Sequence, residues 1–190
     1  NLESGKELGR FVGHEGMVHG MAVIADGQKL VSIDTQTLRI WDVATGAVAT
    51  EHEFWAPKLS DDGGLALVVD EKPGEPRNVL HRMRIHDTMT GALIHEIAID
   101  ELIMIRSHEF RPPNYDFDPD GTHVFVAAYQ PNGPIVAFNL EWGEVAARVP
   151  QGNSVSLHMR PLTGLRTLTS SFDDLIHVWD LNRPGERRVA

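Results

Sequence analysis

Residues 38–46 read Leu38-Arg39-Ile40-Trp41-Asp42-Val43-Ala44-Thr45-Gly46 and join an apolar, strand-prone run to a Trp-Asp pair and a glycine. The step from an anchor residue to a glycine five positions later recurs at His86–Gly91, at Phe138–Gly143 and, with one extra residue, at Trp179–Gly185. The anchors at 41, 86, 138 and 179 are 45, 52 and 41 residues apart. This spacing indicates four repeats of roughly 40–45 residues, with insertions in the middle ones.

A second series of signals lies between the anchors and consists of hairpin turns. These are Asp26-Gly27, Asp62-Gly63, Asp120-Gly121 and Thr163-Gly164. Asp and Gly readily adopt the positive φ that tight hairpins require. The flanking runs alternate as strands do, as over 18–24, 29–33 and 37–41 in the first repeat. No segment has a helical apolar stripe with caps. Each repeat is therefore predicted to form four short antiparallel strands, which makes the chain all-β.

The composition of the 190 residues excludes several functions. Lys and Arg number 17 against 27 Asp and Glu, a net charge of −10, and so acidic a surface disfavours nucleic-acid binding. There is no Cys, which removes disulfides, thiol nucleophiles and Cys-ligated metals. Apolar runs such as Leu65–Val69 are too short to span a bilayer. We therefore expect a soluble protein with no membrane or nucleic-acid partner, and a cytoplasmic location.

The sequence resembles the WD-repeat β-propeller family. In the first repeat the resemblance rests on Gly13-His14, Ala25-Asp26-Gly27, Leu30-Val31-Ser32 and Trp41-Asp42; the fourth matches from 168 to 180. It implies a β-propeller with four blades in this chain, each a four-stranded antiparallel sheet. The expected repeats are 13–50, 51–99, 100–149 and 150–190, and residues 1–12 are expected to be the outer strand of a preceding blade.

The resemblance also implies a hydrogen-bonded tie inside each blade, made by a His, a Ser or Thr, an Asp and the Trp. Its expected members are His14, Ser32, Trp41, His108, Ser171, Asp173 and Trp179. Asp34 or Thr35 falls near the Asp position of the first repeat, and His52 near the His position of the second. The third repeat offers Asn132 and Phe138 for the Asp and the Trp, and in the fourth Gln151 or Asn153 stands for the His. No repeat is expected to hold the complete set in register.

The ends of the chain suggest an incomplete ring. Gly5 implies an anchor immediately before the chain begins, which would make residues 6–11 a strand whose blade partners are missing. Four blades also leave two open sheet faces. We expect the chain to belong to a larger ring of seven or eight blades. Missing blades of a longer chain are the first explanation, and closure by a second copy is the second.

Three possible sites of chemistry have better structural explanations. Asp116-Phe117-Asp118-Pro119-Asp120-Gly121 matches the first half of a calcium loop, but its twelfth position is Ala127, where a Glu is required. The ten His residues show no spacing that would converge three or four ligands on zinc. No nucleophile elbow or phosphate loop occurs. We therefore predict no enzyme activity, no cofactor and no bound metal.

Binding residues are expected on one rim of the propeller, where the blade-joining loops and the loops before each anchor strand meet. Aromatic and Arg side chains gather there and are typical of protein interfaces: Trp55, Arg77, Phe110, Arg111, Tyr129 and Phe172. Trp55 and Phe110 could instead pack between blades, and Trp142 is a candidate on the opposite rim. The predicted function is a non-catalytic protein-interaction scaffold that binds a protein or peptide. The alternatives are a sensor propeller attached to a kinase or protease, and a structural half-ring closed by dimerisation.

Overall fold

The structure is a computed structural model that describes residues 5, 7, 9–54, 57–71, 80–98, 114–128, 132–151, 156–171, 175–182 and 187–189. Each repeat forms one four-stranded antiparallel sheet, or blade, with its strands in chain order. The blades are β1 (Gly20–Ile24), β2 (Lys29–Ile33), β3 (Thr37–Asp42) and β4 (Val48–Glu53); β5 (Lys58–Leu59), β6 (Leu65–Glu71), β7 (Leu80–Asp87) and β8 (Leu93–Ala98); β9 (Asn114–Phe117), β10 (His123–Ala127), β11 (Pro134–Asn139) and β12 (Glu144–Pro150); β13 (Ser156–Leu162), β14 (Arg166–Ser171), β15 (Ile176–Asp180) and β16 (Arg187–Val189).

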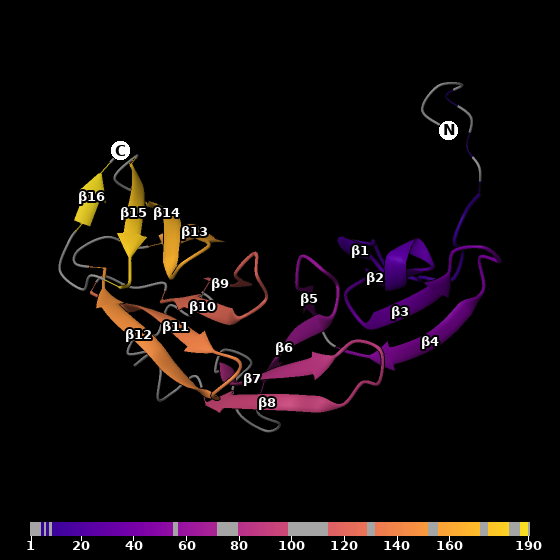
Figure 1. The fold of residues 1–190 in the computed structure, drawn as a ribbon, viewed down its shortest axis with the longest axis horizontal. Helices are drawn as coiled ribbons and strands as arrows, with labels where there is room; N and C mark the ends of the chain where they lie inside the picture. Colours follow the sequence, from indigo (N-terminus) through magenta and orange to yellow (C-terminus); the bar gives the residue numbers. More distant parts are fainter. Residues whose placement is uncertain are drawn as a thin grey trace.

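The four blades follow one another along an open arc (Figure 1). The first strands β1, β5, β9 and β13 line the concave side, and the fourth strands lie on the outside. The first and fourth blades stand at opposite ends of this arc. The predicted all-β propeller of four-stranded blades is therefore confirmed. No helix in the described part of the chain is long and apolar enough to cross a membrane.

The turns between strands show why the glycine and anchor signals recur. Gly27, Gly63, Gly121 and Gly164 all have positive φ, between 65° and 86°, as the hairpin prediction requires. The residue that follows the anchor stabilises the next turn. In the first blade this is Asp42, whose carboxylate accepts the backbone N–H and the hydroxyl of Thr45, both at 2.8 Å. Asp87 does the same with Thr90. These local bonds end β3 and β7 at the same point of each repeat.

Each blade presents one face to the preceding blade and the other to the next, because side chains alternate along a strand. In the first blade Val31, Leu38 and Ile40 are fully buried and pack against Ala66 of the second blade. The next two junctions are built in the same way, around Met83 and Phe138 and around Phe125 and Trp179. The core is thus a series of apolar layers between blades, as in other sheet-on-sheet packings.

Two expectations about the first repeat need correction. Residues 7 and 9–12 form no strand, although a strand was expected over 6–11. Instead the segment crosses the anchor of its own blade, with the Phe11 and Trp41 ring centroids 5.6 Å apart. The outer strand β4 runs to Glu53, past the expected boundary at residue 50.

His52 consequently belongs to β4 of the first blade and not to the start of the second repeat. Its ring lies over Gly91, where an added Cβ would come within 2.6 Å of the imidazole. His95 on β8 lies beside Gly143, the equivalent glycine of the third blade, and bonds through Nε2 to the backbone carbonyl of Leu140. Both outer-strand histidines therefore help to hold one blade against the next.

Candidate partner-binding surface

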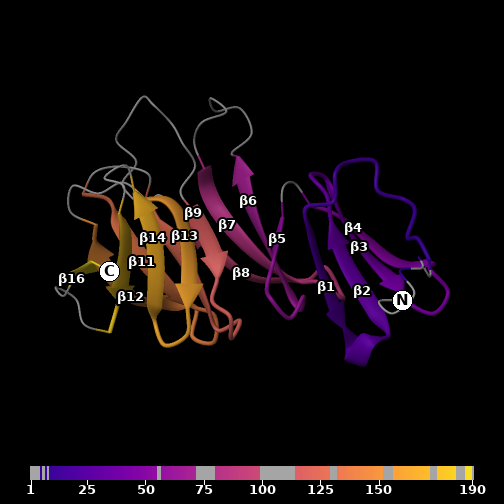
Figure 2. The same cartoon turned by 90° about the horizontal axis from the view of Figure 1, so that it is seen from above.

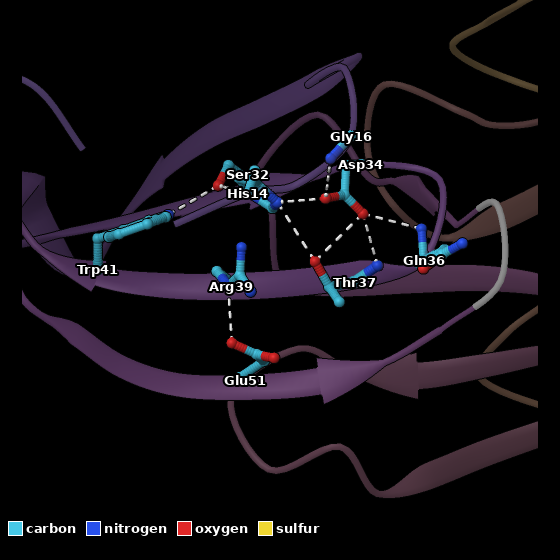
Figure 3. A network of polar contacts seen from close by, with 9 residues as sticks. All are labelled: His14, Gly16, Ser32, Asp34, Gln36, Thr37, Arg39, Trp41 and Glu51. Carbon is cyan, nitrogen blue, oxygen red and sulfur yellow. Dashed lines mark hydrogen bonds and ion pairs between the residues drawn. The ribbon is translucent and has the colours of Figure 1, made fainter. Parts of the chain in front are cut away.

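A buried polar network organises the first blade (Figure 3). The Trp41 indole N–H donates to Ser32 Oγ at 2.7 Å, and Ser32 Oγ lies 2.6 Å from His14 Nε2. His14 Nδ1 lies 2.8 Å from Asp34 Oδ2. The expectation that no repeat holds a complete set is therefore wrong for the first repeat, in which Asp34, and not Thr35, is the carboxylate. The structure brings His14, Ser32 and Trp41 together in one chain of bonds.

The direction of these bonds follows from the chemistry of the two end groups. An indole nitrogen only donates, and an ionised carboxylate only accepts. The Ser32 hydroxyl, which already accepts from Trp41, therefore donates to His14 Nε2. The imidazole then carries its proton on Nδ1 and donates it to Asp34. The side-chain polar atoms that link Trp41, Ser32, His14 and Asp34 therefore all have partners, which is the condition for such a network to be stabilising.

Asp34 also shapes the hairpin between β2 and β3. Its Oδ1 accepts the backbone N–H groups of Gln36 at 2.8 Å and Thr37 at 2.7 Å. Burial by itself would raise the pKa of this carboxyl, but these N–H groups and the His14 ring outweigh burial and hold the pKa well below its usual value. The carboxylate therefore stays ionised at neutral pH and fixes the conformation of residues 34–37.

The fourth blade keeps a shorter version of this network. The Trp179 indole N–H donates to Thr169 Oγ1 at 2.8 Å, and Thr169 is buried. Thr169 was not among the expected members, and the expected Ser171 stays a prediction because its side chain is not described. The register explains the bond, because Trp179 lies opposite Thr167 and its indole reaches the residue two positions further along β14. The same offset relates Trp41, Leu30 and Ser32 in the first blade. The Ser171 side chain, His108 and Asp173 lie outside the described residues.

The second and third blades replace the network with apolar contacts. The same register offset from their anchors leads to Val68 in the second blade and Val126 in the third. Both are buried. His86 turns instead to the backbone carbonyl of Gly91 at 3.0 Å, and Phe138 joins the apolar layer between blades. A Trp anchor thus occurs with a hydroxyl at this position, and a different anchor occurs with valine.

Replacing Thr169 with valine is expected to lower the free energy of unfolding by about 1–2 kcal/mol. Valine has nearly the same shape, so the loss reports on the hydrogen bond between the Trp179 indole N–H and the Thr169 hydroxyl. Urea unfolding followed by tryptophan fluorescence measures it. The matched control is Thr163→Val, at an exposed position in the turn between β13 and β14, which should change the stability little. Equal effects of the two substitutions would show that the Trp179–Thr169 bond contributes nothing.

Asp118 holds the turn that resembled a calcium loop. It is buried, and its Oδ1 accepts the backbone N–H groups of Thr122 and His123, both at 2.8 Å. The segment forms the turn between β9 and β10. Among the described residues, no three His, Asp or Glu side chains are grouped so that they could hold a metal ion.

The six predicted partner-binding residues all lie outside the described residues: Trp55, Arg77, Phe110, Arg111, Tyr129 and Phe172. Residues 72–79, 129–131 and 172–174 join the second strand of a blade to its third, as the hairpin at 34–36 does in the first blade. Trp142 lies in the turn between β11 and β12, on the other rim, and is 70% exposed.

A pocket of about 380 Å³ opens beside the hairpin of the first blade. Its lining includes Glu15, Asp34, Thr35, Gln36, Arg39 and Glu51. The sequence did not predict this pocket, because Glu15 and Glu51 are far apart along the chain and line one pocket only in the folded blade. Arg39 Nε donates to Glu51 Oε2 at 2.7 Å, and this bond lowers the pKa of Glu51. Three carboxylates against one guanidinium leave the pocket acidic.

Comparison with known proteins agrees with this geometry. Residues 5–42 match the family model described as WD domain, G-beta repeat. No curated protein sequence gives a significant match. The solved structure of U3-55K is similar with a TM-score of 0.63 and 11% identity, over 94% of this chain and 53% of that one. The RRP9 WD40 repeats are similar with a TM-score of 0.64 and 12% identity, over 94% and 52%.

The chain thus spans about half the length of these two structures. In all, 1024 chains of solved structures match the fold, so the fold by itself selects no partner. The resemblance noted in the sequence is confirmed: the chain has the WD-repeat β-propeller fold, and its first repeat matches the WD-repeat model.

Proposed function

We propose that the protein is a non-catalytic interaction scaffold that binds a protein or peptide partner through the rim carrying residues 34–37. The pocket beside this hairpin is the observation that supports the proposal most directly. WD-repeat propellers generally act as interaction scaffolds, and this supports the same class of function. The polar groups of the blade network are committed to one another, so they stabilise the rim and are not arranged for chemistry.

The hairpin is held in one conformation before any partner arrives. Asp34 bonds to two backbone N–H groups of the hairpin and to His14, while Thr35 and Gln36 are exposed at its tip. A preorganised loop loses little conformational entropy on binding. This is the property that an interaction surface needs.

The charge of the pocket defines the chemistry of its partner. Glu15 is exposed at the pocket, Glu51 and Asp34 are ionised, and only Arg39 opposes them. A Lys or Arg side chain complements this arrangement, and the net charge of −10 attracts basic partners over longer distances. We therefore assign the pocket to a basic side chain of a protein segment.

Selection from a phage-displayed random-peptide library against the 190-residue chain tests the proposal. The expected result is enrichment of peptides that contain Lys or Arg, whose affinity falls about tenfold or more in the Glu15→Lys variant. The control is Glu141→Lys, which makes the same charge change at an exposed position on the opposite rim. Enriched peptides without basic residues, or equal losses in both variants, would refute this assignment of the pocket.

A further inference from the structure

Arg39 lines the pocket beside the hairpin of the first blade, and the chain leaves part of its guanidinium without a hydrogen-bond acceptor. The residue is 9% exposed, and its Nε donates to Glu51 Oε2 (Figure 3). Within the described residues this is the one hydrogen bond that the guanidinium makes, and its Nη1 is buried with no partner. A buried donor without an acceptor costs free energy, and the cost is larger for a charged group. An acceptor that a partner brings into the pocket would remove this cost.

An equivalent ion pair in the second blade shows that the pair itself does not require a buried arginine. Arg39 of β3 lies directly opposite Glu51 of β4, and Arg84 of β7 lies directly opposite Glu96 of β8. Both pairs join the third and fourth strands of a blade (Figure 2). Arg84 Nε donates to Glu96 Oε2 at 3.0 Å, yet 37% of its side chain is exposed, against 11% for Arg39. Joining the two strands therefore accounts for the bond to Glu51, but not for the buried Nη1.

The three carboxylates of the pocket differ in how far a ligand can reach them. Asp34 already bonds to the hairpin N–H groups and to His14, and its side chain is 3% exposed. It therefore adds negative charge to the pocket without being available for direct contact. Glu15 is exposed, and Glu51 uses Oε2 for Arg39 while 44% of its side chain is exposed. A basic side chain in the pocket is thus expected to contact Glu15 and Glu51.

We propose, on the basis of the function proposed above, that the pocket binds a basic residue together with a backbone carbonyl of the same peptide, and that Arg39 donates to this carbonyl. The positive charge of the ligand lies against Glu15 and Glu51, while the carbonyl oxygen accepts from the guanidinium. A neutral carbonyl suits this place better than a carboxylate, because Glu15, Asp34 and Glu51 would repel another negative charge. The ligand is therefore an Arg or Lys within a peptide chain, and a C-terminal Arg or Lys is disfavoured.

Nuclear magnetic resonance titration of the 190-residue chain with three small guanidinium compounds tests the proposal, followed through the backbone amide signals of residues 34–37. N-acetyl-arginine N-methylamide carries neutral peptide carbonyls, butylguanidine has the same cation without a carbonyl, and N-acetyl-arginine ends in a carboxylate. The methylamide should bind about tenfold more tightly than butylguanidine, because only the methylamide supplies an acceptor to the guanidinium. It should also bind more tightly than N-acetyl-arginine, whose carboxylate meets the negative charge of the pocket.

The Arg39→Met variant tests whether Arg39 is the donor. Methionine keeps an apolar stem but has no N–H group, so the ratio of the methylamide and butylguanidine affinities should fall to about one. The ratio is the readout, because the lost positive charge raises both affinities together. Arg84→Met removes the arginine of the matched pair in the second blade and should leave the ratio unchanged. Circular dichroism with thermal melting checks that both variants fold, and the comparison of the three compounds on the unchanged chain does not depend on either variant.

Failure of this proposal can be distinguished from failure of the proposed function. Equal binding of the methylamide and butylguanidine, or an unchanged ratio in Arg39→Met, would refute the role of Arg39 and leave the pocket assigned to a basic side chain. Tighter binding of N-acetyl-arginine than of the methylamide would overturn the carbonyl and identify a carboxylate as the acceptor. If none of the three compounds shifted the signals of residues 34–37, the assignment of the pocket to a basic side chain would be wrong as well.

Discussion

Replacing Trp41 with alanine is expected to lower the free energy of unfolding by about 4 kcal/mol. The indole is 1% exposed and lies under Phe11 and His14, so its removal opens a cavity in the first blade. The substitution also removes the indole N–H that donates to Ser32 Oγ at 2.7 Å. Single domains are stable by about 5–15 kcal/mol, so this one change removes a large share of the total. Urea unfolding followed by circular dichroism measures the loss.

The matched control is Trp142→Ala, because Trp142 is 70% exposed in the turn between β11 and β12. Its removal should change the stability by less than about 0.5 kcal/mol. The pair compares the same chemical deletion at a buried anchor and at a solvent-exposed position. A small effect at both positions would show that the first blade is not packed around Trp41.

The features that could be predicted from the sequence are the local ones. The hairpin glycines and the anchor pairs act through their nearest neighbours in the sequence. Gly27 adopts the positive φ that its turn requires, and the Asp42 carboxylate accepts the backbone N–H of Thr45 within the next turn. The strands between them follow from apolar alternation. By contrast β5 is two residues long, Lys58–Leu59, and is defined only by its pairing with β6. Two residues are too few for the alternation of apolar and polar side chains to indicate a strand.

The contacts that sequence reasoning missed depend on register between strands. Thr169 is one of several hydroxyl residues along β14, and the position of Trp179 opposite Thr167 brings the indole N–H within reach of it. His52 resembles the start of a repeat when spacing alone is counted, yet it is on an outer strand and packs on Gly91 of the next blade. The acidic pocket likewise combines residues from a loop, a hairpin and β4.

Asp34→Asn is expected to lower the free energy of unfolding by about 2 kcal/mol at pH 7, and Asp34→Ala by about 3 kcal/mol. Asparagine keeps an acceptor for the N–H groups of Gln36 and Thr37, but it loses the charge and turns an amide toward the proton on His14 Nδ1. Alanine leaves all three donors without a partner in a buried site. Chemical unfolding of the three proteins at pH 7 measures both losses.

The pH dependence of this effect has a definite sign. The pKa of Asp34 is depressed in the folded state, while an unfolded Asp titrates near about 3.9. The stability that its ionised form contributes is therefore fully present at neutral pH, and it is lost as the pH falls below about 4 toward the folded pKa. The gap between the unchanged chain and Asp34→Asn should shrink between pH 7 and pH 3. Asp120→Asn, in an exposed turn, serves as the control and should show a negligible gap at both pH values. A gap for Asp34 that stays constant over this range would mean that His14 and the hairpin do not depend on its charge.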